Sequence, residues 1–294
     1  TLFRPRTGTI ALLLCDATNP FFTTVARGVE DAASDAGSLV LLCNTDESEE
    51  EELRYMRMLV EKRVDGVLLV PARDGAESIA LAKRHGVPVV AIDRRVADPT
   101  VDVVRCDSAS GAAELGRLLR ALGHRRIAIL AGPEGVSTSD ERIAAFIAAI
   151  DSSEIAVFYG QFNQASGRQM VQEALQANPA PTAIFATNNF ISIGAMQELH
   201  AQNRRVPEEI ALVGFDDLPP AMVTFPFLTV VSQPAYDMGH QAVERLRERL
   251  DKTELETIEI VLPTSVLIRR SSGEPREASE SPFPLRAAEG EGVG

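Results

Sequence analysis

Short apolar runs return at regular intervals along this chain, and each has the length of a strand that is buried on both faces. They occupy residues 10–15, 39–43, 66–70, 88–92, 127–130, 183–186 and 210–214. Amphipathic segments separate them, as between Phe22 and Ala36, where Gly37 ends a helical pattern. The alternation of strand and helix predicts parallel, doubly wound sheets and an α/β fold.

The number of strand and helix units indicates two lobes. About four units precede Asp107 and about four follow it, which is more than one compact open sheet requires. After Gln233 the pattern changes to a long helix over 234–250 and an extended stretch over 258–268. We predict an N-terminal lobe and a C-terminal lobe that are joined by a hinge of several segments: residues 8–106 with 234–257, and residues 107–233 with 258–270. Residues 271–294, rich in Ser, Gly, Glu, Pro and Ala, are predicted to form a disordered tail.

Composition excludes some partners. Hydrophobic residues make up 45% of the 294 residues, as in globular proteins. The net charge of -13 argues against direct contact with a nucleic-acid backbone, so DNA binding would need another module. The acidic run of Asp46, Glu47 and residues 49–52 is interpreted as the solvated start of a helix. A signal-peptide pattern and a membrane-length apolar stretch are both absent from the sequence, which predicts a cytoplasmic protein without a membrane partner.

The motifs of common catalytic sites are absent from the sequence. The three cysteines have no paired spacing, so neither a disulfide framework nor a zinc site is indicated. A phosphate-binding glycine loop, a nucleophile elbow and the H-E-x-x-H pattern do not occur, and the four histidines lie far apart. We therefore predict a protein that is not an enzyme and that needs no metal or cofactor.

Polar and aromatic residues follow the apolar runs. Ligands of open parallel sheets bind beyond the carboxyl ends of the strands, so these positions are candidates for a binding site. After the first run, Asn19 can cap a helix that begins at Pro20. Phe21 and Phe22 cannot both face the core at helical spacing, so one ring is predicted to contact a ligand or the other lobe. Residues 93–95 pair a carboxylate with guanidinium groups, as a ligand site or a surface ion pair would.

The second half contributes a similar set of residues. Arg142 lies beyond the strand over 127–130, Phe162 follows a strand that ends near 159, and Asn188, Asp216 and Gln233 follow the last three runs. Each has an ordinary loop explanation. Together the two halves supply carboxylates, guanidinium groups, amides and aromatic faces, which match the hydroxyls and the apolar C–H face of a sugar.

From residue 8 to about 270 the sequence resembles the effector-binding domains of the lactose and galactose repressor (LacI/GalR) family, which are related to periplasmic sugar-binding proteins. The motifs that carry the resemblance are residues 19–22 (NPFF), 64–67 (VDGV), 92–94 (IDR), 123–127 (GHRRI), 205–208 (RVPE) and 213–217 (VGFDD). The resemblance implies a periplasmic-binding-protein-like type I fold, a homodimer and a role in transcription. It also implies an N-terminal helix-turn-helix head, which we expect to be missing from this chain, so that operator DNA is contacted only through that head.

The resemblance also implies a ligand. Ribose-binding members of the superfamily have a pocket pattern to which ten positions correspond: Asn19, Phe21, Phe22, Asp93, Arg94, Arg142, Phe162, Asn188, Asp216 and Gln233. Ribose or a close pentose is therefore the expected effector. One departure is Asn189, where relatives commonly have Asp; the change removes a carboxylate and alters either hydroxyl selectivity or a structural contact.

We expect the sugar to shift an equilibrium between open and closed lobes, with hinge segments near Asp107, Gln233 and Ile258. In the family this movement passes through the dimer to the DNA heads. The alternative is a mature extracytoplasmic sugar-binding protein of an ABC importer, with the same pocket.

Overall fold

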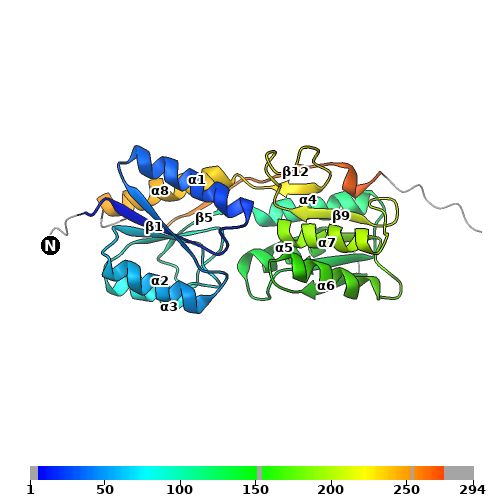
Figure 1. The fold of residues 1–294 in the computed structure, drawn as a ribbon, viewed down its shortest axis with the longest axis horizontal. Coiled ribbons are helices and arrows are strands. Elements are labelled where there is room, and N and C mark those ends of the chain that lie inside the picture. Colours follow the sequence, from blue (N-terminus) through cyan, green and yellow to red (C-terminus); the bar gives the residue numbers. More distant parts are fainter. Residues whose placement is uncertain (1–5, 151–153, 253–254, 275–294) are drawn as a thin grey trace, which may run out of the picture.

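The structure is a computed structural model that describes residues 6–150, 154–252 and 255–274. These residues form two lobes side by side, each with a sheet of six strands between two layers of helices (Figure 1). The expected α/β class, with two doubly wound lobes, is confirmed.

The sheet of the first lobe is entirely parallel. Its strands are β1 (Thr9–Leu14), β2 (Leu39–Asn44), β3 (Gly66–Leu69), β4 (Val89–Ile92), β5 (Asp102–Cys106) and β11 (Glu259–Leu262). They are arranged in the order β11-β5-β4-β3-β1-β2. The strands of the central part are buried on both faces, which explains why they are continuous apolar runs in the sequence.

Two helices cover each face of this sheet. They are α1 (Pro20–Asp35) and α8 (Ala235–Asp251) on one face, and α2 (Glu49–Glu61) and α3 (Ala76–Arg84) on the other. Val25 of α1 and Leu246 of α8 belong to one core cluster, and Met56 of α2 and Ile79 of α3 belong to the opposite one. Helix α8 therefore completes a lobe whose other helices, between 20 and 84, lie at least 150 residues earlier in the chain.

The second lobe repeats this plan. Its strands are β6 (Ile127–Ala131), β7 (Ile155–Tyr159), β8 (Ala183–Ala186), β9 (Ala211–Phe215), β10 (Thr229–Ser232) and β12 (Ser265–Leu267). Its helices are α4 (Ser108–Ala121) with α5 (Ser137–Ile150) on one face, and α6 (Gln164–Leu175) with α7 (Asn189–Ala201) on the other. The strand order is β12-β10-β9-β8-β6-β7. The edge strand β12 runs antiparallel to β10, so this sheet departs from the parallel arrangement that the sequence pattern predicts.

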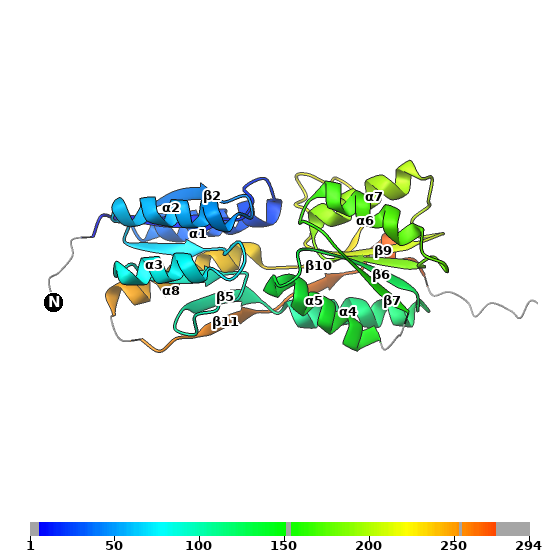
Figure 2. The same ribbon diagram turned by 90° about the horizontal axis from the view of Figure 1, so that it is seen from below.

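The chain crosses between the lobes three times (Figure 2): after β5 near Asp107, after β10 at 233–234, and between β11 and β12 at 263–264. The third crossing differs from the predicted boundary at 258. Strand β11 pairs with β5 and so belongs to the first lobe, because Ile260 and Leu262 pack against its core. Pro263, which has no N–H to donate to a sheet, follows the end of that strand.

The predicted start of the disordered tail at 271 is wrong for the first residues. Ser271 and Ser272 are buried in a short 3-10 helix, η1 (Arg270–Ser272). The Ser271 hydroxyl donates to the carbonyl oxygen of Leu212 at 2.6 Å and accepts from the backbone N–H of Thr229 at 2.8 Å. These hydrogen bonds fix the segment against the second sheet. Residues 275–294 lie outside the described part of the chain.

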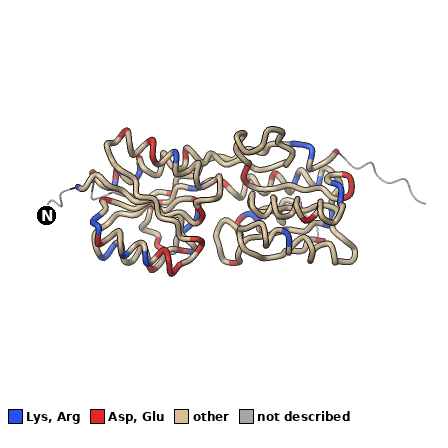
Figure 3. Tube along the Cα trace, in the orientation of Figure 1, with Lys and Arg blue, Asp and Glu red and all other residues tan. Residues whose placement is uncertain are grey.

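Charged residues of both signs occur on both lobes (Figure 3). Within the described ranges, no helix is long and apolar enough to cross a membrane, and no group of His, Cys, Asp and Glu side chains is arranged to hold a metal ion.

Candidate ligand-binding site

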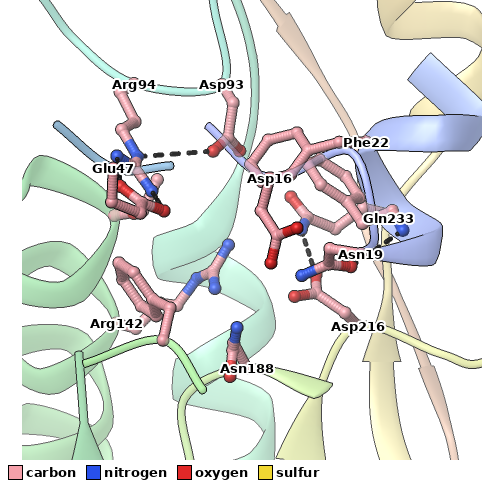
Figure 4. Close-up of a pocket in the computed structure, with 13 residues that line it drawn as sticks. Asp16, Asn19, Phe22, Glu47, Asp93, Arg94, Arg142, Asn188, Asp216 and Gln233 are labelled. Carbon is pink, nitrogen blue, oxygen red and sulfur yellow. Dashed lines mark hydrogen bonds and ion pairs between the residues drawn. The ribbon is translucent and has the colours of Figure 1, made fainter. Parts of the chain in front are cut away.

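A pocket of about 370 Å³, counted with its opening to solvent, lies between the lobes where the carboxyl ends of the strands face each other (Figure 4). All ten candidate residues line it, together with three that are not among the candidates: Asp16, Glu47 and Thr138. The structure therefore brings residues from positions 16 to 233 to one place.

The start of α1 supplies an amide and two aromatic rings. The Asn19 side chain caps the helix by accepting from the backbone N–H of Phe21 at 3.0 Å. The rings of Phe21 and Phe22 meet edge to face, with centroids 5.1 Å apart. Both rings are buried in the first-lobe core and both line the pocket, so the expectation that only one could face the core is wrong. The first helical turn lies over the end of the sheet, where core and pocket meet.

Asp93 and Asp216 occupy equivalent positions in the two lobes. Each directly follows a central strand, β4 or β9, and each has a left-handed backbone, with φ of 68° and 69°. Such a conformation costs a non-glycine residue on the order of 1–3 kcal/mol and is concentrated at functional sites. Burial raises the pKa of Asp93, although Arg142 and Arg94 oppose the shift. Burial likewise raises the pKa of Asp216, against the opposing effects of Arg142 and of the hydrogen bond from Gln233.

Arg94 is held rigidly at the pocket wall. Its Nη1 donates to Glu47 Oε2 at 2.6 Å and to the carbonyl oxygens of Pro71 and Ala72, both at 2.9 Å. Its Nη2 donates to Glu47 Oε1 at 2.7 Å. The side chain is 3% exposed, so this pairing takes place almost entirely out of water. Arg94 also lies 5.3 Å from the ring centroid of Phe162 in the other lobe.

Arg142 projects from α5 into the pocket between the lobes. Its Nη1 donates to the carbonyl oxygen of Thr187 at 2.7 Å, and its guanidinium lies 3.8 Å from the centroid of the Phe215 ring. Nearby, Asn188 caps α7 by accepting from the N–H of Ile191 at 2.8 Å. These contacts orient two polar side chains without using all of their hydrogen-bonding capacity.

Phe162 and Gln233 complete the pocket. The Phe162 ring packs on Gly132, where an added Cβ would lie 2.1 Å from the ring, so only glycine leaves room for it. Gln233 lies at the second crossing between the lobes, and its side-chain amide donates to Asp216. A binding residue and a hinge segment thus coincide.

The acidic run that was interpreted as a solvated helix start is only partly solvated. Glu47 turns inward to Arg94, and Glu52 is buried, where it accepts from the backbone N–H of Ala72 at 2.7 Å. Glu47 follows the end of β2, and Asp16 follows the end of β1, so the rule that placed the other residues would have found both. Thr138 lies within the first turn of α5 and carries no comparable signal.

Three pocket residues have unmet hydrogen-bonding groups. Within the described part of the chain, five buried side-chain nitrogen or oxygen atoms lack a partner, and three of them belong to pocket residues: Arg94 Nε, Arg142 Nε and Gln233 Oε1. A buried donor or acceptor without a partner costs about 1–3 kcal/mol, so such groups are uncommon away from binding sites. Two N–H donors and one carbonyl acceptor are therefore available at this pocket.

Direct hydrogen bonds join the lobes beside the pocket. Asn19 Nδ2 donates to Asn189 Oδ1 at 3.1 Å, and Asn189 Nδ2 donates back to Asn19 Oδ1 at 2.8 Å. The backbone N–H of Arg95 donates to Ser137 Oγ at 3.0 Å. Of the two consequences considered for Asn189, a structural contact is the one that the described hydrogen bonds show. These bonds hold the lobes together over the pocket.

Two sheets of this topology, three crossings and a pocket between the lobes define a two-lobed binding protein of the periplasmic-binding-protein-like type I fold. The model of one family matches residues 7–270, and its description is periplasmic binding proteins and sugar binding domain of the LacI family. The chain belongs to this family, and the resemblance seen in its motifs is confirmed.

Known relatives are transcriptional regulators. The ribose operon repressor of Halalkalibacterium halodurans is 33% identical over 274 residues, which cover 92% of this chain and 82% of that repressor. The HTH-type transcriptional repressor PurR of Aliivibrio salmonicida is 31% identical, over 90% of this chain and 81% of that protein. A LacI family regulator from Enterococcus faecium, solved with bound ribose, has a TM-score of 0.81 and 29% identity, over 92% of this chain and all of that one. The chain is thus an effector-binding domain of the LacI-family type.

Proposed function

We propose that the chain senses ribose or a similar small sugar, which binds in the pocket between the lobes. The unpartnered buried atoms of Arg94, Arg142 and Gln233 carry the proposal, because a polyol supplies both acceptors and donors for them. The ten candidate residues act as its ligand-binding set. The carboxylates of Asp93 and Asp216 accept from sugar hydroxyls, while Phe21, Phe22 and Phe162 cover apolar C–H faces. Similarity to a regulator that was solved with bound ribose supports the same ligand.

Binding is converted into a signal by lobe closure. Because the ligand contacts both lobes, its affinity is higher for the closed form, and it shifts the equilibrium toward that form by this difference. Gln233 lies at a crossing between the lobes and therefore links ligand contact directly to the hinge. We propose that the protein acts as a homodimer in the cytoplasm. Lobe closure then changes how helix-turn-helix heads upstream of this domain bind operator DNA.

The alternatives are less well supported. An importer's binding protein would use the same pocket, but the two relatives described above are transcriptional repressors. An enzyme of the interlobe cleft would need a nucleophile with a base or a metal set, and the charged pocket residues are carboxylates and guanidinium groups, of which Glu47 and Arg94 are paired. Mass spectrometry of the sugar after incubation with the protein is expected to recover it unchanged; a converted product would contradict the non-enzymatic role.

Calorimetric titration with pentoses, hexoses and purine nucleosides tests the proposal. Ribose or a close pentose is expected to bind most tightly. Asp93→Ala and Arg94→Ala are expected to weaken binding by roughly ten- to hundredfold, since a hydrogen bond to a charged group contributes about 1.5–3 kcal/mol. Arg117→Ala, an exposed change on α4 outside the pocket, serves as control. Absence of heat with every sugar, or affinities equal to wild type in both pocket variants, would reject the proposal.

A further inference from the structure

Glu47 gives the pocket a charge balance that favours uncharged ligands. The lining contains four carboxylates, those of Asp16, Glu47, Asp93 and Asp216, but only the two guanidinium groups of Arg94 and Arg142. The guanidinium of Arg94 is not free to meet an anion. Arg94 is paired with Glu47 and lies 4.0 Å from Asp93, and Arg142 acts electrostatically on both Asp93 and Asp216. An entering anion would meet an excess of negative charge.

The backbone holds Glu47 in place. Asp46 and Glu47 form two consecutive left-handed residues, with φ of 51° and 59°. The backbone N–H of Glu47 donates to the carbonyl oxygen of Cys15 at 3.1 Å, and Ser48 caps the N-terminus of α2 immediately afterwards. Two adjacent non-glycine residues in this region are costly, and such strain is typical of functional sites. The conformation turns the Glu47 carboxylate onto Arg94, away from the exposed side chains of Glu49 and Glu50 that follow it.

The pairing leaves one edge of Arg94 for a ligand. Glu47 Oε1 and Oε2 occupy the end of the guanidinium, at Nη2 and Nη1. The buried Nε–H, which makes no hydrogen bond and lies 4.0 Å from Asp93 Oδ2, and the second hydrogen of Nη2 remain. Two adjacent hydroxyl oxygens of a sugar can accept from this edge. A phosphate could bind the same edge, but Glu47 already neutralises the positive charge of Arg94. The usual strength of an arginine–phosphate pair would therefore be lost.

We propose that Glu47 is a specificity-determining residue that lets the pocket accept a free sugar and exclude its phosphate ester. The proposal rests on the proposed sugar-binding function and names a selection within it. Glu47 repels an anionic ligand and occupies the end of the Arg94 guanidinium. The pocket thus discriminates by disfavouring the phosphate ester, in addition to favouring the free sugar. At 23% side-chain exposure, Glu47 lies nearer to solvent than Arg94, so its removal also opens space beside the guanidinium.

Titration of the protein with ribose and with ribose 5-phosphate tests this inference, with ligand-induced thermal shift as a second readout. Wild type is expected to bind the free sugar at least about a hundredfold more tightly. Glu47→Ala removes the carboxylate and opens space beside Arg94. It should lower the ratio of the affinity for ribose to the affinity for ribose 5-phosphate by about tenfold or more, because the phosphate ester binds more tightly. Glu47→Gln keeps the shape and should narrow it by less.

Two further variants separate Glu47 from charge in general. Asp16→Asn removes the same charge from the pocket without freeing Arg94, and Glu50→Gln removes it from an exposed position of α2 outside the pocket. Glu50→Gln should leave the ratio unchanged, and Asp16→Asn should narrow it less than Glu47→Gln does. A ratio unchanged by both Glu47 variants, or an equal effect of Asp16→Asn, would overturn the role of Glu47 while leaving sugar binding intact. Failure of folded wild type to bind ribose would reject both proposals.

Discussion

Asp93 and Asp216 show what the site demands of single residues. Each carboxylate is buried, each is carried on a left-handed backbone, and each directly follows a central strand of its lobe. Neither burial nor backbone geometry stabilises the fold. Strain and desolvation of this kind are concentrated at functional sites, so we infer that a carboxylate at each position contributes to ligand binding and thereby offsets its cost in folding free energy.

Asp93→Asn is expected to separate stability from binding. Because burial raises the folded-state pKa of Asp93 above its unfolded value, the folded state holds more protons between the two values, and stability falls as pH rises through that window. The uncharged Asn removes this penalty. Chemical denaturation should therefore show a higher free energy of unfolding for Asp93→Asn at neutral pH, with the difference shrinking as the pH is lowered.

Sugar affinity should move the opposite way in the same variant, falling by roughly tenfold or more, because an amide is a weaker acceptor than a carboxylate. Asp35→Asn, an exposed change at the end of α1, serves as control. Lower stability of Asp93→Asn at neutral pH, or undiminished affinity, would contradict the assignment.

At the scale of residues, the sequence predicted those candidates that directly follow a strand. Asn19, Asp93, Asn188 and Asp216 each follow an apolar run, and parallel strands bring such positions together. Glu47 was missed because its neighbours, Glu49 and Glu50, are exposed and the whole run has one composition. Composition cannot show which carboxylate a left-handed turn directs inward.

At the scale of elements, pairs of helices pack through reciprocal glycines. An added Cβ at Gly28 of α1 would lie 2.0 Å from the carbonyl oxygen of Tyr236, and one at Gly239 of α8 would lie 2.1 Å from that of Val25. Helices α6 and α7 repeat the arrangement: Gly167 approaches the backbone of Ile191. Backbones this close allow no side chain between them, so the glycines set the distance between the helices in both lobes.

Gly239→Ala tests this packing. Helix propensity alone predicts a gain of about 1 kcal/mol. The contact with α1 predicts the opposite, a loss of about 1–3 kcal/mol from overpacking, because backbone atoms cannot move aside as a flexible side chain can. Denaturant titration measures the free energy of unfolding, and a variant more stable than wild type would show that the helices separate freely.

Some elements could not be predicted from the apolar pattern. Strand β5 contains the charged residues Asp102 and Arg105, so the apolar pattern does not indicate that Asp102 is buried. Asp102 is 1% exposed because Arg245 and Arg249 of α8 pair with it, at 3.1 Å and 2.6 Å. Similarly, the stretch over 258–268 has one composition but forms two strands in two sheets. Both outcomes depend on partners far away in the sequence.

For the whole molecule, the reciprocal amide pair of Asn19 and Asn189 links the two lobes directly. Each amide is oriented by its own helix, because Asn19 Oδ1 accepts from Phe21 N–H and Asn189 Oδ1 accepts from Phe190 N–H at 2.7 Å. The two side chains are therefore preorganised to meet when the lobes close. Their hydrogen bonds contribute to the closed form and not to the open one.

Asn189→Ala should shift the equilibrium toward the open form. Two neutral hydrogen bonds contribute about 0.5–1.5 kcal/mol each, which together predict sugar affinity lower by roughly five- to 150-fold. Small-angle scattering of the ligand-free variant should give a larger radius of gyration. Gln197→Ala removes an exposed amide hydrogen bond within the second lobe, from the same helix, and should change neither quantity. Equal affinity of Asn189→Ala and wild type would show that closure does not depend on this pair.

The three crossings also have a consequence for the order in which the protein can be assembled. Helix α8 and strand β11 belong to the first lobe, yet they follow nearly all of the second lobe in the chain. During synthesis from the N-terminus, α1 therefore emerges long before the helix that packs on it, and the apolar face shared with α8 stays uncovered in the meantime. When residue 232 has been added, the second lobe still lacks the edge strand β12 and the short helix η1. The later lobe in the sequence is thus the first that can become nearly complete.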